Sequence, residues 1–152
     1  MVSVRITIED DSELYNIAPK VLQSLKDTNV GVEIHNTLAR YCYPYVPMDT
    51  GTLFTSTEVT NNYLRYNTPY AHYMYVGKVY GPNIPIIENG QIVGWFSIPN
   101  KKKSPTGKSI NYSTSKHPLA THHWDKAMMQ DRAEDFSSEV GDIIERRIHH
   151  ER

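Results

Sequence analysis

The sequence predicts an α+β fold, and three observations lead to that prediction. Residues 2–8 alternate between apolar and polar, as in a strand with one buried face. Apolar residues recur at helical spacing before Pro44 and again after Pro118. Between these segments, short β-branched and aromatic runs are separated by turn residues, which is typical of antiparallel hairpins. We therefore expect one domain, residues 1–152, with an N-terminal strand, a long helix, a small antiparallel sheet with a projecting hairpin, and a long C-terminal helix packed on the sheet.

The first helix is expected to begin between Ser12 and Lys20, where the residues supply turn and helix-start chemistry and a proline suits a first helical turn. It is expected to end before Pro44. Asn29 and Gly31 are its weakest point, because both residue types are poor helix formers. Its apolar positions are Val21, Leu22, Leu25, Val30, Ile34, Leu38 and Tyr41.

A first hairpin and a short helix are expected next. Residues 53–60 and 63–67 have extended patterns and flank a turn at Asn61-Asn62. Residues 69–77 predict a short helix or a tight loop, because a proline opens the segment and a glycine closes it.

A second hairpin is expected within a long excursion, residues 80–116. The apolar runs 84–87 and 92–96 flank Asn89-Gly90, which is the strongest short hairpin signal. Residues 99–116 are mainly lysine, serine, threonine, proline and glycine, and we expect them to form a loop. Excursions of this length are usually functional or mobile.

The last helix is expected after Pro118 and ends in a polar tail, residues 146–152. Its spacing gives one apolar stripe for packing on the sheet. The residues of the stripe are Trp124, Met128, Phe136, Val140, Ile143 and Ile144.

The composition of the chain excludes several classes of function. Sixteen basic and seventeen acidic side chains leave the chain near neutrality, which argues against a generic nucleic-acid or membrane-surface binder. The single cysteine, Cys42, excludes an intrachain disulfide and is compatible with a reducing compartment. The N-terminus does not resemble a signal peptide, and no apolar run approaches the ~20 residues of a membrane span. We expect a protein made in the cytoplasm that needs no cofactor or metal to fold.

Tyrosine is concentrated in one part of the chain, since nine of the eleven tyrosines lie within residues 41–80. Tyrosine has an apolar ring and a polar tip, so it suits surfaces that become buried on assembly. Ordinary packing in a core or strand explains any one of these residues equally well. The residues that we predict to lie in contacts between subunits are Tyr70, Tyr73, Tyr75, Ile86, Ile92, Trp95 and Phe96.

The tripeptide Asp49-Thr50-Gly51 has two interpretations. In an aspartic protease, two such aspartates share a proton and activate a water, and each must follow a hydrophobic strand. Here a helix and two prolines precede the tripeptide, and prolines cannot donate to a sheet. We therefore predict a structural turn formed by Pro47, Asp49, Thr50 and Gly51, in which proline fixes its own φ and glycine accepts a positive φ.

Two further kinds of site are weaker alternatives. His117, His122, His123 and Asp125 have the ligand types of a metal site, which would make the chain a metal-dependent hydrolase. Adjacent histidines on a helix point about 100° apart, however, which disfavours shared coordination. Lys101, Lys102, Lys103, Lys108 and Lys116 would serve a small DNA-binding module, although a solvated basic loop explains them more simply.

Three segments in this order resemble the minor capsid and head–tail joining (neck) proteins of tailed bacteriophages. They are Tyr-Val-Pro-Met-Asp-Thr-Gly-Thr-Leu at 45–53, Pro-Tyr-Ala-His-Tyr-Met-Tyr-Val-Gly-Lys at 69–78, and His-Pro-Leu-Ala-Thr-His-His-Trp-Asp-Lys-Ala at 117–127. In that family a Pro-x-Asp-Thr-Gly-x-Leu turn follows the first long helix, and a Tyr-Ala-x-Tyr-x-x-x-Gly segment follows the strands. The resemblance covers residues 36–129, and the 80–116 excursion is longer than the minimal fold needs.

The resemblance implies a structural protein of the virion, made in the host bacterial cytoplasm, and it brings no catalytic residues. The implied partners are other copies of the chain and other virion proteins, namely portal, adaptor or tail proteins. Contact with packaged DNA would be incidental, and no membrane is implied. We therefore expect a homo-oligomeric, non-enzymatic subunit that acts in particle assembly.

Overall fold

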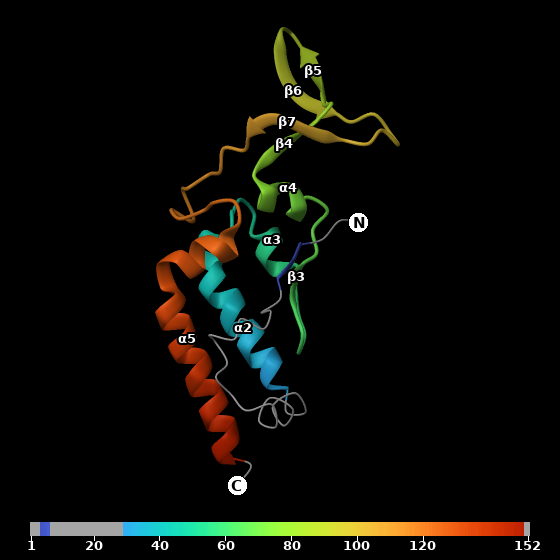
Figure 1. The fold of residues 1–152 in the computed structure, drawn as a ribbon. Coiled ribbons are helices and arrows are strands. Elements are labelled where there is room, and N and C mark those ends of the chain that lie inside the picture. Colours follow the sequence, from blue (N-terminus) through green and yellow to red (C-terminus); the bar gives the residue numbers. More distant parts are fainter. Residues whose placement is uncertain (1–3, 7–28, 151–152) are drawn as a thin grey trace.

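The computed structural model describes residues 4–6 and 29–150, and it has the α+β architecture that the sequence predicts. Figure 1 shows the helices α2 and α5 side by side, with a hairpin projecting at the opposite end of the molecule. The helical elements are α2 (Val30–Cys42), the 3-10 helix η1 (Tyr43–Tyr45), α3 (Thr52–Thr55), α4 (Ala71–Val76) and α5 (Trp124–His150). The strands are β1 (Val4–Ile6), β2 (Thr57–Val59), β3 (Leu64–Tyr66), β4 (Lys78–Gly81), β5 (Ile84–Glu88), β6 (Gln91–Phe96) and β7 (Ser104–Ser109).

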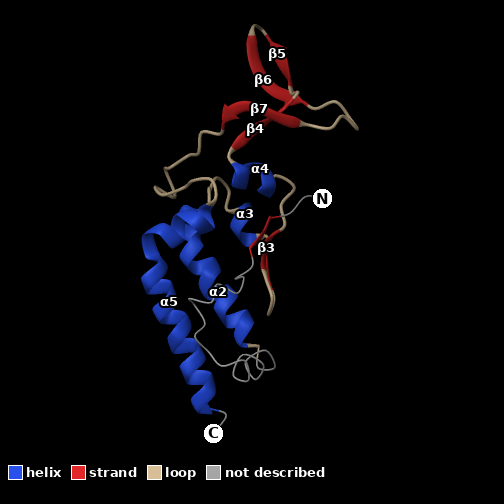
Figure 2. Cartoon of the chain, viewed as in Figure 1, coloured by secondary structure: helices blue, strands red, loops and turns tan. Residues whose placement is uncertain are grey.

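All the strand pairs in the described part of the chain are antiparallel, and they form three small sheets (Figure 2). The first has the order β1-β3-β2, with Tyr66 of β3 opposite Val4 on one side and opposite Thr57 on the other. The other two are the pairs β4-β7 and β5-β6. The N-terminal strand and the first hairpin are thus confirmed, and the strand residues expected at 2–3 and 7–8 lie outside the described residues.

The core lies between α2, α5 and the first sheet. Every residue of the apolar stripe predicted for the last helix is buried there. The Trp124 ring packs edge-on against Tyr66 of β3, with ring centroids 5.2 Å apart, and the Phe136 ring packs edge-on against Tyr41 of α2 at 5.5 Å. The packing of the long C-terminal helix on the sheet is therefore confirmed.

The first helix is described only from Val30, so the start expected between Ser12 and Lys20 lies outside the described residues. Asn29 has a left-handed backbone (φ 57°) immediately before α2, which agrees with the predicted weak point. The helix ends at Cys42 and gives way to a 3-10 turn that contains Pro44. That end is where the sequence predicts it, because proline cannot donate to the preceding helical turn.

Two predicted segments differ from the structure. The extended run expected at residues 53–60 begins with the short helix α3, and only Thr57–Val59 forms a strand. The hydroxyl of Thr55 donates to the Gly51 carbonyl oxygen (3.2 Å) and that of Ser56 donates to Leu53 (2.8 Å). Such local bonds compete with sheet pairing, so they favour one helical turn over a strand.

The loop expected at residues 99–116 contains the strand β7, which pairs with β4. Its sequence, Ser-Pro-Thr-Gly-Lys-Ser, has little strand propensity. The pairing is irregular, because the register shifts between Lys78 and Tyr80 and Gly107 has a φ of 81°. Residues 104–109 therefore form a strand because they pair with β4, and not because of their own strand propensity.

None of the helices in the described part of the chain is long and apolar enough to cross a membrane.

The buried His35 of α2 predicts a stability that depends on pH. Its Nδ1 lies 2.7 Å from the Gly31 carbonyl oxygen, while its Nε2 is buried without a partner, and burial lowers the pKa of its imidazole. In the unfolded chain, His35 takes up a proton near pH 6.5, whereas in the folded chain its imidazole is protonated only at lower pH. Acidification from pH 7.5 to 5.5 therefore favours the unfolded chain, and the free energy of unfolding falls. In His35→Leu, chemical denaturation at both pH values should show a smaller fall. An equal fall in both proteins would contradict this assignment.

Candidate functional site

The turn that follows η1 is held by backbone geometry and by Thr50. Gly51 has a φ of 86°, which an L side chain rarely adopts, and its carbonyl oxygen accepts the Thr55 N–H at 3.0 Å to begin α3. The Thr50 hydroxyl oxygen lies 2.7 Å from that of Thr52 and accepts the Thr52 N–H at 3.4 Å. Pro47 is buried, whereas Asp49 is exposed, and no described residue hydrogen-bonds its carboxylate. Among the described residues, the hydrogen bonds of this turn therefore come from the backbone and from Thr50.

Hydrogen bonds connect the segment before α5 to this turn. His117 is buried, with its Nδ1 2.7 Å from the Val46 carbonyl oxygen, and the Lys116 ammonium donates to the Asp49 carbonyl oxygen. The Thr121 N–H donates to Tyr45 at 3.0 Å. A peptide carbonyl only accepts, so the hydrogen of His117 resides on Nδ1.

The helix α4 is also hydrogen-bonded to the residues around the start of α5. The His123 N–H donates to the carbonyl oxygen of Tyr75 at 2.9 Å, and the hydroxyl of Tyr75 donates to an oxygen of Asp125 at 2.8 Å. The hydroxyl of Tyr112 donates to the Met74 carbonyl oxygen at 2.6 Å. The three sequence segments 45–53, 69–78 and 117–127 are therefore joined in one place, although they lie far apart in the sequence.

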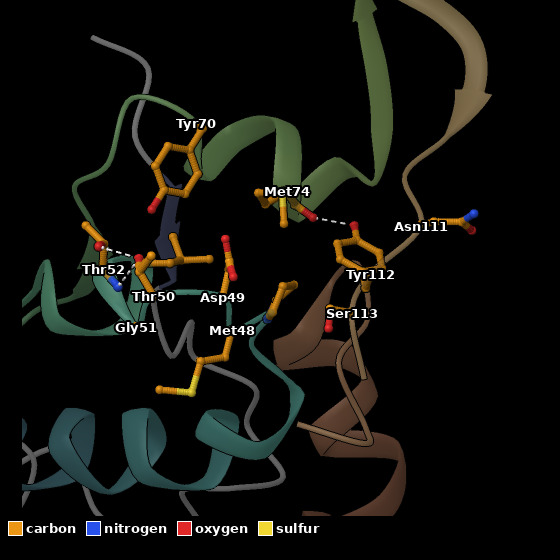
Figure 3. Close-up of a pocket in the computed structure, with 12 residues that line it drawn as sticks. Met48, Asp49, Thr50, Gly51, Thr52, Tyr70, Met74, Asn111, Tyr112 and Ser113 are labelled. Carbon is orange, nitrogen blue, oxygen red and sulfur yellow. Dashed lines mark hydrogen bonds between the residues drawn. The ribbon is translucent and has the colours of Figure 1, made fainter. Parts of the chain in front are cut away.

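A cavity of about 620 Å³ opens beside the Asp-Thr-Gly turn (Figure 3). Figure 3 shows Tyr70, Met48 and Met74 around it, with the side chain of Asp49 directed toward it. Its walls come from the turn, from α4 and from residues 111–113 that precede α5. The lining is mainly apolar with a single carboxylate, so it suits an apolar group better than a phosphate or a metal ion.

The three tyrosines predicted to contact other subunits occupy different environments. Tyr70 is 41% exposed beside the cavity. The Tyr73 ring packs on Tyr80, with centroids 4.8 Å apart, and remains partly exposed. Tyr75 packs edge-on against Trp124 at 5.0 Å and bonds Asp125, so it has an internal structural role whatever else it contacts. Of the other clustered tyrosines, Tyr41, Tyr45 and Tyr66 are buried in the core, where ordinary packing explains them.

The β5–β6 hairpin carries the largest exposed apolar surface in the described part of the chain. It was predicted from Asn89-Gly90, and both residues have the positive φ of a tight hairpin turn (50° and 78°). Its side chains lie outside the core. The four predicted contact residues of this hairpin are Ile86, Ile92, Trp95 and Phe96, with exposed fractions of 43%, 56%, 62% and 48%.

The candidate metal ligands do not form one site. Within residues 4–6 and 29–150, no group of three histidine, cysteine, aspartate or glutamate side chains is placed to hold a metal ion. His117 is directed to Val46 and Asp125 accepts from Tyr75, while Nδ1 of His122 and of His123 lie 2.8 Å apart. Burial lowers the pKa of His123, and the neighbouring charges of His122 and Lys126 lower it further.

The lysines of the excursion are spread over its surface. Lys103 donates to Asn83 at 2.8 Å within the excursion. Lys78, just before the excursion, donates to Ser109 of β7 at 3.2 Å. Lys101 and Lys102 are exposed in the connection between β6 and β7. This arrangement suits a basic surface that is exposed to solvent.

The cavity could not be predicted from the sequence. Met74, Asn111 and Tyr112 line it, yet the sequence marks none of them, because their proximity depends on how three distant segments pack. The sequence singles out the Asp-Thr-Gly turn and Tyr70, which form parts of the wall, but it does not show that they lie together.

Comparisons of the chain with protein-family models, with curated proteins and with solved structures found no match.

Proposed function

We propose that this chain is a structural subunit of a tailed-bacteriophage virion, a minor capsid or head–tail neck protein that acts in particle assembly and is not an enzyme. The observation that carries the assembly role is the β5–β6 hairpin, because strands with this much exposed apolar surface mark an interaction site. The resemblance of the segments 45–53, 69–78 and 117–127 connects the role to phage particles. The hydrogen bonds that join the three segments support their being parts of one structural unit.

The arrangement suits an assembly protein physically. A rigid base of α2, α5 and the first sheet holds an apolar hairpin away from itself, where neighbours can bury it (Figure 1). The partners proposed are other copies of the chain and the portal, adaptor or tail proteins of the same virion. The site of action is the virion, after synthesis in the host bacterial cytoplasm.

The test is deletion of the gene from the phage genome that carries it, followed by electron microscopy of the lysate. We expect DNA-filled heads without joined tails, or unstable heads, and restoration of complete particles when the intact gene is supplied in trans. Mass spectrometry of purified wild-type virions should detect the chain in a fixed ratio to the portal protein. Complete infectious particles from the deletion phage, or absence of the chain from purified virions, would overturn the proposal.

A further inference from the structure

The β5–β6 hairpin is apolar on both of its faces. Residues directly opposite in an antiparallel pair point to the same face, and successive residues of one strand alternate between faces. The register pairs Ile84 with Phe96 and Ile86 with Gly94, so Ile84, Ile86 and Phe96 share what we call the first face. The pairs Pro85 with Trp95 and Ile87 with Ile92 place Ile87, Ile92 and Trp95 on the second face.

Neither face is covered by the core of the described residues. Seven large apolar side chains of the hairpin are 43–62% exposed, and each would offer on the order of 200 Å² if fully exposed. Together they present on the order of 700 Å² of apolar surface, or roughly 350 Å² on each face. One face therefore supplies about half of the roughly 800 Å² that a partner contributes to a standard interface. A two-stranded hairpin is only marginally stable alone. An exposed apolar surface of this size marks an interaction site, and a contact through one face alone is small.

The tip of the hairpin limits what that occupant can be. The tip consists of Glu88, Asn89, Gly90 and Gln91, which are all exposed and polar or without a side chain. A hairpin entering a membrane or a cavity tip-first would have to desolvate the Glu88 carboxylate, which is costly. The faces along the hairpin carry no other charge, so flat contact between two hairpins meets no repulsion between like charges.

We propose that successive copies of this chain stack through their hairpins, with the first face of one copy against the second face of the next. Two different faces that bind each other give a head-to-tail contact, which closes into a ring when the rotation between copies allows it. Each contact places Trp95 of one copy near Phe96 of another, and aromatic pairs of this kind favour packed interfaces. The inference rests on the proposed assembly function and specifies the surface that performs it.

Single-cysteine variants test the direction of stacking. The native Cys42 is fully buried, and burial raises the pKa of its thiol, so it competes little for oxidation. Full-length Ile86→Cys marks the first face and full-length Ile92→Cys, carrying a size tag, marks the second. On mild oxidation at high protein concentration, the mixture should give disulfide-linked dimers of the two variants, in about tenfold excess over dimers of either variant with itself.

Two controls separate stacking from random collision and from unfolding. Ser138→Cys, an exposed position on α5, should form no dimer with either hairpin variant above the level of chance encounter. Adding Trp95→Ser to Ile92→Cys should reduce the mixed dimer about tenfold, whereas adding it to Ile86→Cys should leave it unchanged. Far-UV circular dichroism checks that each variant is folded.

Other results would overturn the inference. Predominant linking of either variant with itself would indicate a twofold contact between like faces. No mixed dimer above the Ser138→Cys control would mean that copies do not stack, and flotation with phosphatidylglycerol vesicles would then identify a lipid surface as the occupant. A chain present in virions that fails to cross-link would leave the proposed function standing while removing this contact.

Discussion

Replacing Trp124 with alanine should lower the free energy of unfolding by about 3–5 kcal/mol, the usual cost of removing a large aromatic side chain from a core. Trp124 is fully buried at the first residue of α5, and its ring packs against Tyr66 at 5.2 Å and Tyr75 at 5.0 Å. It therefore joins the last helix to the sheet and to α4. A domain of this size is stable by only about 5–15 kcal/mol, so the variant should be marginally folded at 37 °C.

The other tryptophan provides the matched control. Trp95 is 62% exposed on the hairpin and lies outside the core, so Trp95→Ala should change the free energy of unfolding by less than about 0.5 kcal/mol. Urea denaturation followed by far-UV circular dichroism measures both variants without depending on tryptophan fluorescence. Equal losses in the two variants would show that the hairpin packs on the core more closely than this structure has it.

Sequence reasoning succeeded where local chemistry determines the structure. The turn at Asn89-Gly90 needs two positive φ values, which these residues accept, and the hairpin lies where the sequence predicts it. The apolar stripe from Trp124 to Ile144 is buried as its spacing predicts, because helical periodicity fixes one face of α5. In both cases a few residues contain all the information that is needed.

It failed where a distant partner decides the structure. The strand β7 has a loop-like sequence and becomes a strand because β4 offers it an edge. The interval 52–55 has a strand-like composition but forms α3, because hydroxyl groups bond back to nearby carbonyl oxygens. Neither outcome follows from propensity alone.

The candidate site also has features that the sequence predicts and features that it does not. The exposed side chains of Ile86, Ile92, Trp95 and Phe96 are consistent with the predicted contact surface, whose role in assembly stays a prediction. The turn at Gly51 has the positive φ expected of it, yet the side-chain hydrogen bonds that hold it among the described residues come from Thr50 and not from Asp49. The role of Asp49 in the turn therefore stays a prediction, and its side chain faces the cavity that the packing of three separate segments creates.

Gly31→Ala should destabilise the protein by about 1–3 kcal/mol, although alanine is the better helix former. A Cβ at Gly31 would overlap the backbone carbonyl oxygen of Asn61, in the turn between β2 and β3. The Asn61 side-chain oxygen also accepts the Val32 N–H at 3.1 Å, near the start of α2. Because the obstacle is backbone, the whole turn must shift, and the bond to Val32 is strained with it.

Gly141→Ala is the matched control, because Gly141 also lies inside a helix but a Cβ there meets no atom within 4 Å. That variant should gain about 0.5–1 kcal/mol, since alanine loses less backbone entropy on folding than glycine does. The same substitution in two helices is thus expected to change the free energy of unfolding with opposite signs. Thermal denaturation of both variants beside the parent measures the signs directly. If both gained stability, the close approach of α2 to the β2–β3 turn would be refuted, because helix propensity alone would then account for both results.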